Sequence, residues 1–128
     1  MIIDLTIYIK SILHKQYTIL LFIDANEFLV SKSGVAKLIN ETGLIDHISL
    51  KHGILNEPKT HMRGSSRIDF AFFSRFLNQY IKLYGITPFD DISVVDHREI
   101  FDDIDTCSFF KEILKPQQPF SRLLSTKN

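Results

Sequence analysis

The stretch TILLFIDANEFLV, residues 18–30, begins as a buried strand and then changes character. Five apolar residues, 19–23, run directly into a carboxylate, Asp24, and after one alanine into an amide, Asn26. A short apolar run of this length is typical of a strand in the interior of a sheet. The polar residues that follow fit either a surface turn or functional side chains at a strand end. The remainder of the chain has to decide between these two interpretations.

The rest of the sequence alternates between helical and strand patterns. Residues 2–14 alternate in part like a strand, but their length and Lys-rich end favour a helix. The other predicted elements are helices over 33–43, 75–85 and 109–114, strands over 18–24 and 67–74, a strand pair over 92–104 interrupted near Asp96, and either element over 44–50. Residues 56–66 contain turn formers and are predicted to be a loop. Strands that alternate with helices predict an α/β fold.

Composition limits the class of protein. A chain of 128 residues with 45% hydrophobic residues and eleven Phe is long enough for one domain with its own core. No apolar run approaches the ~18 residues that a membrane helix needs, so no membrane partner is expected. A single cysteine excludes an intramolecular disulfide and fits an intracellular location, cytoplasmic or nuclear.

Charge is balanced in total but not in distribution. Fifteen basic and fifteen acidic residues give a formal net charge of zero, which argues against binding to nucleic acid mainly by phosphate neutralisation. A basic segment lies at 47–67 and an acidic one at 90–105. The two segments fit either oppositely charged solvated faces or one site that binds both anions and cations, and charge alone favours solvated faces.

Three predicted strands carry polar residues that a buried strand would not choose. These are Asp24 with Asn26, then Asp69, and then Asp96 with His97. Each alone has a structural explanation: a carboxylate in a turn, a partner for Arg67, or an exposed loop pair. Their occurrence together and in this order favours a functional site.

The same residues resemble a known family. FIDAN at 22–26, THMRGSSRIDF at 60–70 and VVDH at 94–97 resemble the second half of the endonuclease/exonuclease/phosphatase superfamily, which includes deoxyribonuclease I, abasic-site endonucleases and non-LTR retrotransposon nucleases. That family shows Gly-Asp-x-Asn at a strand end, a Thr followed by an Arg-Ile-Asp-Tyr strand, and a terminal Ser-Asp-His. The resemblance extends from about Ile19 to about Ile104. It implies an α/β fold with mixed or antiparallel sheet and flanking helices, as one half of a two-sheet sandwich.

The resemblance also implies roles for individual residues in phosphodiester hydrolysis. Asp24 would orient or deprotonate the attacking water, and Asn26 would hold a phosphate oxygen. His97 would contact the scissile phosphate, and Asp69 would fix its tautomer. Asp96 would help to bind a divalent cation, with magnesium expected and manganese as its substitute.

The resemblance further implies a substrate. Arg63 and Arg67 are expected to contact it, although Arg67 also fits a structural salt bridge. The implied substrate is nucleic acid, with DNA favoured over RNA.

Three positions depart from the family pattern: Ile23 stands for the Gly, Ala25 for a bulky apolar residue, and Val95 for the Ser. No Asn, and no carboxylate other than Asp4, precedes Asp24, so the family's metal-binding Glu has no counterpart. We therefore expect residues 1–108 to be the C-terminal part of such a domain, and 109–128 a short helix with a polar tail.

A half domain would leave one sheet face uncovered, either that of Ile19, Leu21 and Ile23 or that of Leu20 and Phe22. Self-association, or a catalytically inactive remnant that binds a partner or nucleic acid, is therefore the alternative to nuclease activity. A zinc site is not expected, because His14, His47, His52 and His61 lack helical or finger-type ligand spacing.

Overall fold

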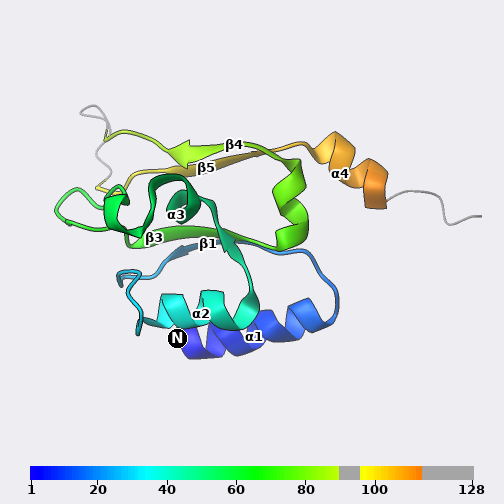
Figure 1. Cartoon of the computed structure of the whole chain (residues 1–128), viewed down its shortest axis with the longest axis horizontal. Helices are drawn as coiled ribbons and strands as arrows, with labels where there is room; N and C mark the ends of the chain where they lie inside the picture. The colour runs from blue at the N-terminus through cyan, green and yellow to red at the C-terminus, as the bar shows by residue number, and fades with distance from the viewer. Residues whose placement is uncertain (90–95, 114–128) are drawn as a thin grey trace, which may run out of the picture.

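The computed structural model describes residues 1–89 and 96–113. A three-stranded antiparallel sheet forms the middle layer (Figure 1). Two helices, α1 (Ile2–His14) and α2 (Gly34–Thr42), cover one face of this sheet. A two-stranded antiparallel hairpin of β4 (Ile81–Ile86) and β5 (Ile100–Ile104) lies on the other side. The predicted α/β class, with antiparallel sheet and flanking helices, is confirmed.

The middle sheet is built around its central strand. The strand order is β1 (Leu20–Asp24), β3 (Asp69–Phe73) and β2 (Ile45–Asp46). In the β1–β3 register, Leu20 pairs with Phe73 and Asp24 pairs with Asp69. Side chains alternate between the faces of a strand, so every second residue of β1 points toward the helices. Leu21 and Ile23 accordingly pack with Phe70 and Phe72 against the helical layer.

Local sequence explains where α2 begins and ends. The side chain of Ser33 accepts the N–H of Ala36, and Glu27 Oε1 accepts the N–H of Val35 at 2.6 Å. These bonds use backbone donors that the first turn of a helix otherwise leaves without partners. Gly43 ends the helix in the left-handed conformation at φ 68°, as the sequence predicts. The second acidic residue of the opening stretch, Glu27, is thereby explained as a helix cap.

The hairpin covers the second face of the sheet only in part. Ala71 and Phe73 of β3 pack with Leu77, Ile81 and Ile100 on this side. On β1, however, Leu20 is 40% exposed and Phe22 is 50% exposed. Of the two sets expected to be uncovered, it is therefore Leu20 and Phe22 that face solvent.

One predicted element is wrong in part, and another is described only in part. Residues 75–85 were expected to form one helix, but they divide into the 3₁₀ helix η2 (Arg75–Tyr80) and strand β4. Of the strand pair expected over 92–104, the second strand is confirmed as β5, and residues 92–95, where the first was expected, lie outside the described residues. Pairing between β4 and β5 explains why residues 81–85 form a strand, because hydrogen bonds to a distant strand outweigh a local helical pattern.

The ambiguous stretch 44–50 contains both elements, since β2 leads directly into α3 (His47–His52), which is followed by the 3₁₀ helix η1 (Ile54–Asn56). Helix α4 (Thr106–Ile113) confirms a short helix near the predicted position, and the expected boundary at 108/109 falls inside it. The predicted polar tail, 114–128, lies outside the described residues. Among the helices that the structure describes, none has both the length and the apolar character needed to cross a membrane.

Candidate functional site

The first predicted motif forms a turn that places Asp24 beside Asp69. These residues are direct partners at the ends of β1 and β3, and the backbone pairing continues one residue further, from Ala25 N–H to Ile68 O at 2.9 Å. Asp24 Oδ1 accepts the N–H of Asn26 at 3.1 Å, and Asn26 has a left-handed φ of 52°. Asparagine tolerates this conformation better than most residues. The turn interpretation is therefore confirmed for Asp24, and the turn leaves its side chain beside Asp69.

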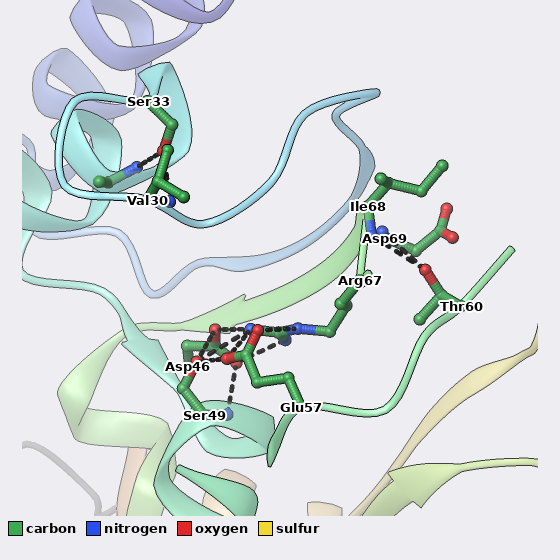
Figure 2. Close-up of polar contacts among 10 residues, drawn as sticks. Val30, Ser33, Asp46, Ser49, Glu57, Thr60, Arg67, Ile68 and Asp69 are labelled. Carbon is green, nitrogen blue, oxygen red and sulfur yellow. Dashed lines mark hydrogen bonds and ion pairs between the residues drawn. The ribbon is translucent and has the colours of Figure 1, made fainter. Parts of the chain in front are cut away.

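Thr60 fixes the strand that carries Asp69. Its side chain is fully buried, and its Oγ1 accepts the N–H groups of Ile68 at 3.0 Å and of Asp69 at 3.1 Å (Figure 2). A hydroxyl oxygen has two lone pairs, so both are used here. The Thr of the second motif thus holds the start of β3 in place.

Backbone pairing between distant segments brings His97 to the two carboxylates. His61 and His97 form an isolated antiparallel bridge, in which Met62 N–H donates to Asp96 O and Arg98 N–H donates to Thr60 O, each at 2.7 Å. His97 Nδ1 then lies 2.9 Å from Asp69 Oδ2. The residues expected at three separate strand ends, Asp24, Asp69 and His97, are therefore brought together.

The Asp69 carboxylate favours the protonated form of His97. Its hydrogen bond raises the pKa of His97 above the ordinary 6.5, against an opposing effect of partial burial, and the charges of Asp69, Asp24 and Asp96 add to the increase. The ring therefore keeps its second proton to higher pH than a free imidazole does. The protonated form of this imidazole is suited to contact a phosphate oxygen.

Asp96, the predicted metal ligand, lies beside two imidazoles. Its side chain is 65% exposed, and its Oδ2 is 3.3 Å from His61 Nε2. Hydrogen bonding to its own backbone, and then to His61, lowers the pKa of Asp96. This carboxylate is consequently ionised at neutral pH.

A pocket of about 250 Å³ adjoins Asp24 and Asp69. Its lining also includes Phe22, Ile23, Phe70, Arg98 and Ile100. Arg98 is held by bonds from Nε to Thr87 O and from Nη1 to Lys59 O, the latter at 3.2 Å. The pocket thus has two carboxylates and one fixed guanidinium on its walls. The sequence does not single out Arg98 or His61 as site residues. The available signal was their position, because Arg98 directly follows His97 and His61 directly follows Thr60.

Arg67 lies outside this pocket, and the substrate contact expected for it is wrong because its side chain is buried. Its guanidinium is completely buried, with Nη1 2.9 Å from Asp46 Oδ1 and Nη2 2.8 Å from Glu57 Oε1 (Figure 2). Ser49 and the Phe70 ring complete its contacts. Burial by itself lowers the pKa of Arg67, and the two acids more than offset this, so the pKa is raised. A guanidinium already saturated by buried partners is unavailable to a phosphate, so Arg67 is the structural salt-bridge partner.

Arg63 and Asn26 both remain accessible. Each is exposed, and within the described part of the chain neither side chain makes a hydrogen bond or an ion pair. Asn26 follows directly from the turn beside Asp24, whereas Arg63 belongs to the loop between Thr60 and Arg67. Their side chains are therefore free to contact a ligand.

Comparisons with known proteins found no matching family model, no match among curated proteins and no match among solved structures. What the site can do must therefore be argued from its own geometry. Two carboxylates and an imidazole, with a guanidinium nearby, can position a water, bind an anion and transfer a proton.

Proposed function

We propose that this chain carries phosphodiester-hydrolysing residues of the endonuclease/exonuclease/phosphatase type, acting on nucleic acid, DNA in preference to RNA, in an intracellular setting. The observation that carries the proposal is the Asp69–His97 hydrogen bond of 2.9 Å directly beside Asp24. Three segments far apart in the sequence contribute to this group. A purely structural pair would not require an exposed carboxylate and an accessible amide at the same place.

Each residue has a role that its surroundings support. Asp24 is exposed and ionisable beside the pocket, so it can orient a water or accept its proton. His97 donates from Nδ1 to Asp69, which leaves Nε2 to contact a phosphate oxygen. Asn26 and Arg98 add a neutral and a charged donor for the remaining oxygens.

Magnesium, with manganese as its substitute, is the cation that the resemblance implies. Asp24 and Asp96 both present exposed carboxylates, which are the ligands that Mg²⁺ prefers and which it supplements with waters. Asp96 would hold the ion, whereas Asp69 is already engaged by His97. A bound magnesium ion would neutralise charge that develops on the phosphate.

Nicking of supercoiled DNA tests the proposal. We expect the wild-type chain to nick DNA in the presence of Mg²⁺, and a chelator to stop the reaction. His97→Ala and Asp24→Asn should abolish nicking, while the matched control His52→Ala, an exposed histidine on α3, should leave it unchanged. Absence of nicking by a folded wild-type chain would contradict the proposal.

A second candidate function, partner binding, is favoured by the exposed apolar side of β1. Strand β1 is at the edge of the sheet in the described part of the chain, and Leu20 and Phe22 project from it into solvent. Leu20 also lines a hollow of about 500 Å³ together with Tyr8 and Tyr17. An unpaired strand edge beside exposed apolar side chains is a surface on which a second copy can add a strand.

Self-association can be measured by analytical ultracentrifugation of the wild-type chain and Phe22→Ser. The candidate function predicts a concentration-dependent dimer that the substitution weakens. A monomer at all concentrations, with identical behaviour of Phe22→Ser, would exclude pairing through this edge.

A further inference from the structure

The Asp96 carboxylate lies between two imidazoles that come from separate segments. Its Oδ2 is 3.3 Å from His61 Nε2, and its Oδ1 is 4.0 Å from His97 Nε2. One ligand atom from each of the three residues can be chosen so that all lie within 4.8 Å of one another. We propose that His61, Asp96 and His97 form a binding site for a zinc-class transition ion, such as Zn²⁺ or Co²⁺.

The donor set selects this class of ion. Imidazole nitrogen is a favoured ligand of Zn²⁺ and Co²⁺, whereas Mg²⁺ is bound almost entirely by oxygen. Three protein ligands with a fourth, solvent-facing position are the arrangement of open zinc sites. Two nitrogens and one carboxylate therefore suit a transition ion better than the magnesium ion that the resemblance implies.

The spacing of the ligands is close to what such an ion needs. Bonds of about 2.0–2.2 Å place the ligand atoms of a tetrahedral site roughly 3.3–3.5 Å apart. His61 Nε2 already has this separation from Asp96 Oδ2, and the distance from His97 Nε2 to the other oxygen, Oδ1, is slightly wider at 4.0 Å. Because the Asp96 side chain is exposed, a small rotation can close the second gap.

The backbone around the site is fixed. The bridge between His61 and His97 holds the two rings with centroids 4.8 Å apart. Its bonds from Met62 N–H and Arg98 N–H depend on no side chain of the three ligands. Replacement of a ligand side chain should therefore leave the frame intact.

The ring nitrogens are partly oriented for binding. His97 donates from Nδ1 to Asp69, which leaves Nε2 as the ligand atom, as in many carboxylate–histidine–metal arrangements. His61 Nδ1 accepts the Arg63 N–H at 3.3 Å, so the neutral ring carries its proton on Nε2. An ion at Nε2 moves this proton to Nδ1, so the long bond from Arg63 is lost and the hydrogen bond between His61 Nε2 and Asp96 is replaced by bonds to the ion.

Ion binding has a consequence that rests on the proposed function. A zinc-class ion on His97 Nε2 occupies the nitrogen that would contact the phosphate, and it also engages Asp96. It should therefore inhibit any hydrolysis that depends on magnesium.

Cobalt binding tests the site without reference to activity. Co²⁺ is titrated into the chain and followed by visible absorption, with Zn²⁺ as competitor, in a Cys107→Ser background because that thiol is exposed. We expect one Co²⁺ per chain. Loss of a residue that only orients a ligand costs about 10–100-fold in affinity, so His61→Gln should weaken binding by at least about 100-fold.

The matched control is His52→Gln, which should bind Co²⁺ like the parent chain. Asp96→Asn provides a second ligand variant, and circular dichroism checks that each variant is folded. No Co²⁺ binding by the folded parent chain, or equal weakening in His52→Gln, would overturn the site. Cobalt binding by a chain that nicks no DNA would support this site and contradict only the hydrolytic function.

Discussion

Two clusters of acidic and basic side chains flank the start of β3, and they differ in how completely their groups are bonded. The Arg67 side chain is 0% exposed, and each of its three nitrogens donates to a carboxylate of Asp46 or Glu57. The His97 side chain is 33% exposed, and only its Nδ1 has a close partner. The first cluster has no bonding capacity left for a ligand, whereas the second retains a free ring nitrogen and two exposed carboxylates.

The difference shows how to tell a charge cluster that stabilises the fold from one that is open to a ligand. Both contain a basic side chain between acids, and both use residues of the same sequence motif, RID at 67–69. A buried ion pair is costly to break because its removal leaves an unpaired charge out of water. An exposed pair adds little to stability, but its open positions can bind other molecules.

The largest expected effect is on the buried cluster. Arg67→Met leaves Asp46 and Glu57 buried without their cation, and should lower the free energy of unfolding by about 3–5 kcal/mol. Urea denaturation measures this. His97→Ala and the exposed Arg63→Met should each cost less than about 1 kcal/mol. A small effect of Arg67→Met, or a large one of His97→Ala, would break the comparison.

A second prediction concerns Thr60, which connects the two clusters. Thr60→Val keeps the shape but removes the acceptor of two N–H groups, and should cost about 1–3 kcal/mol of unfolding free energy. Thr60→Ser, which retains the hydroxyl, should keep the N–H signals of Ile68 and Asp69 protected from hydrogen exchange. Equal exchange in both variants would show that the hydroxyl does not hold β3.

Asp102 differs from the acids of both clusters. It is a partly buried carboxylate that has neither the bonded cation of the first cluster nor the solvent exposure of the second. Among the described residues its Oδ2 has no hydrogen-bond partner, and burial raises its pKa from the ordinary 3.8 to about 6, although nearby His47 lowers it. Since the folded pKa is above the unfolded one, this contribution to stability is complete below pH 3.8 and is lost as pH rises through about 6.

Asp102→Asn should therefore raise the free energy of unfolding above pH 6 by about 1–2 kcal/mol, allowing for partial solvation. The measurement is thermal and urea unfolding of both chains between pH 4 and pH 8. A variant that is less stable than the wild type at pH 8 would contradict this reading of Asp102.

Much of the fold could be predicted because it depends on local signals. The apolar run before Asp24 and the glycine at 43 mark their elements without reference to the rest of the chain. Residues 75–85 could not be predicted in this way. Leu77 and Tyr80 are buried as a helical pattern requires, but from Ile81 the chain pairs with β5, which local spacing does not reveal.

The residues of the candidate site could be predicted from the sequence, but the contacts among their side chains could not. Asp24, Asp69 and His97 were identified from motif order, and the structure places them together. The acidic partners of Arg67 come from the end of β2 and from the residue after η1, and no pattern near residue 67 indicates them. His61 does not stand out as a metal ligand from its spacing along the chain. Its neighbour in space, His97, is distant in sequence and is brought beside it by a strand bridge.

Nuclear magnetic resonance titration of the histidine rings tests the central claim, that Asp69 and His97 form an open, polarised pair. The account predicts that the pKa of His97 lies above 6.5 in the wild-type chain and falls in Asp69→Asn. The exposed His52 serves as an internal control in the same spectra and should not respond. A His97 pKa that is unchanged by Asp69→Asn would contradict the pairing and the function built on it.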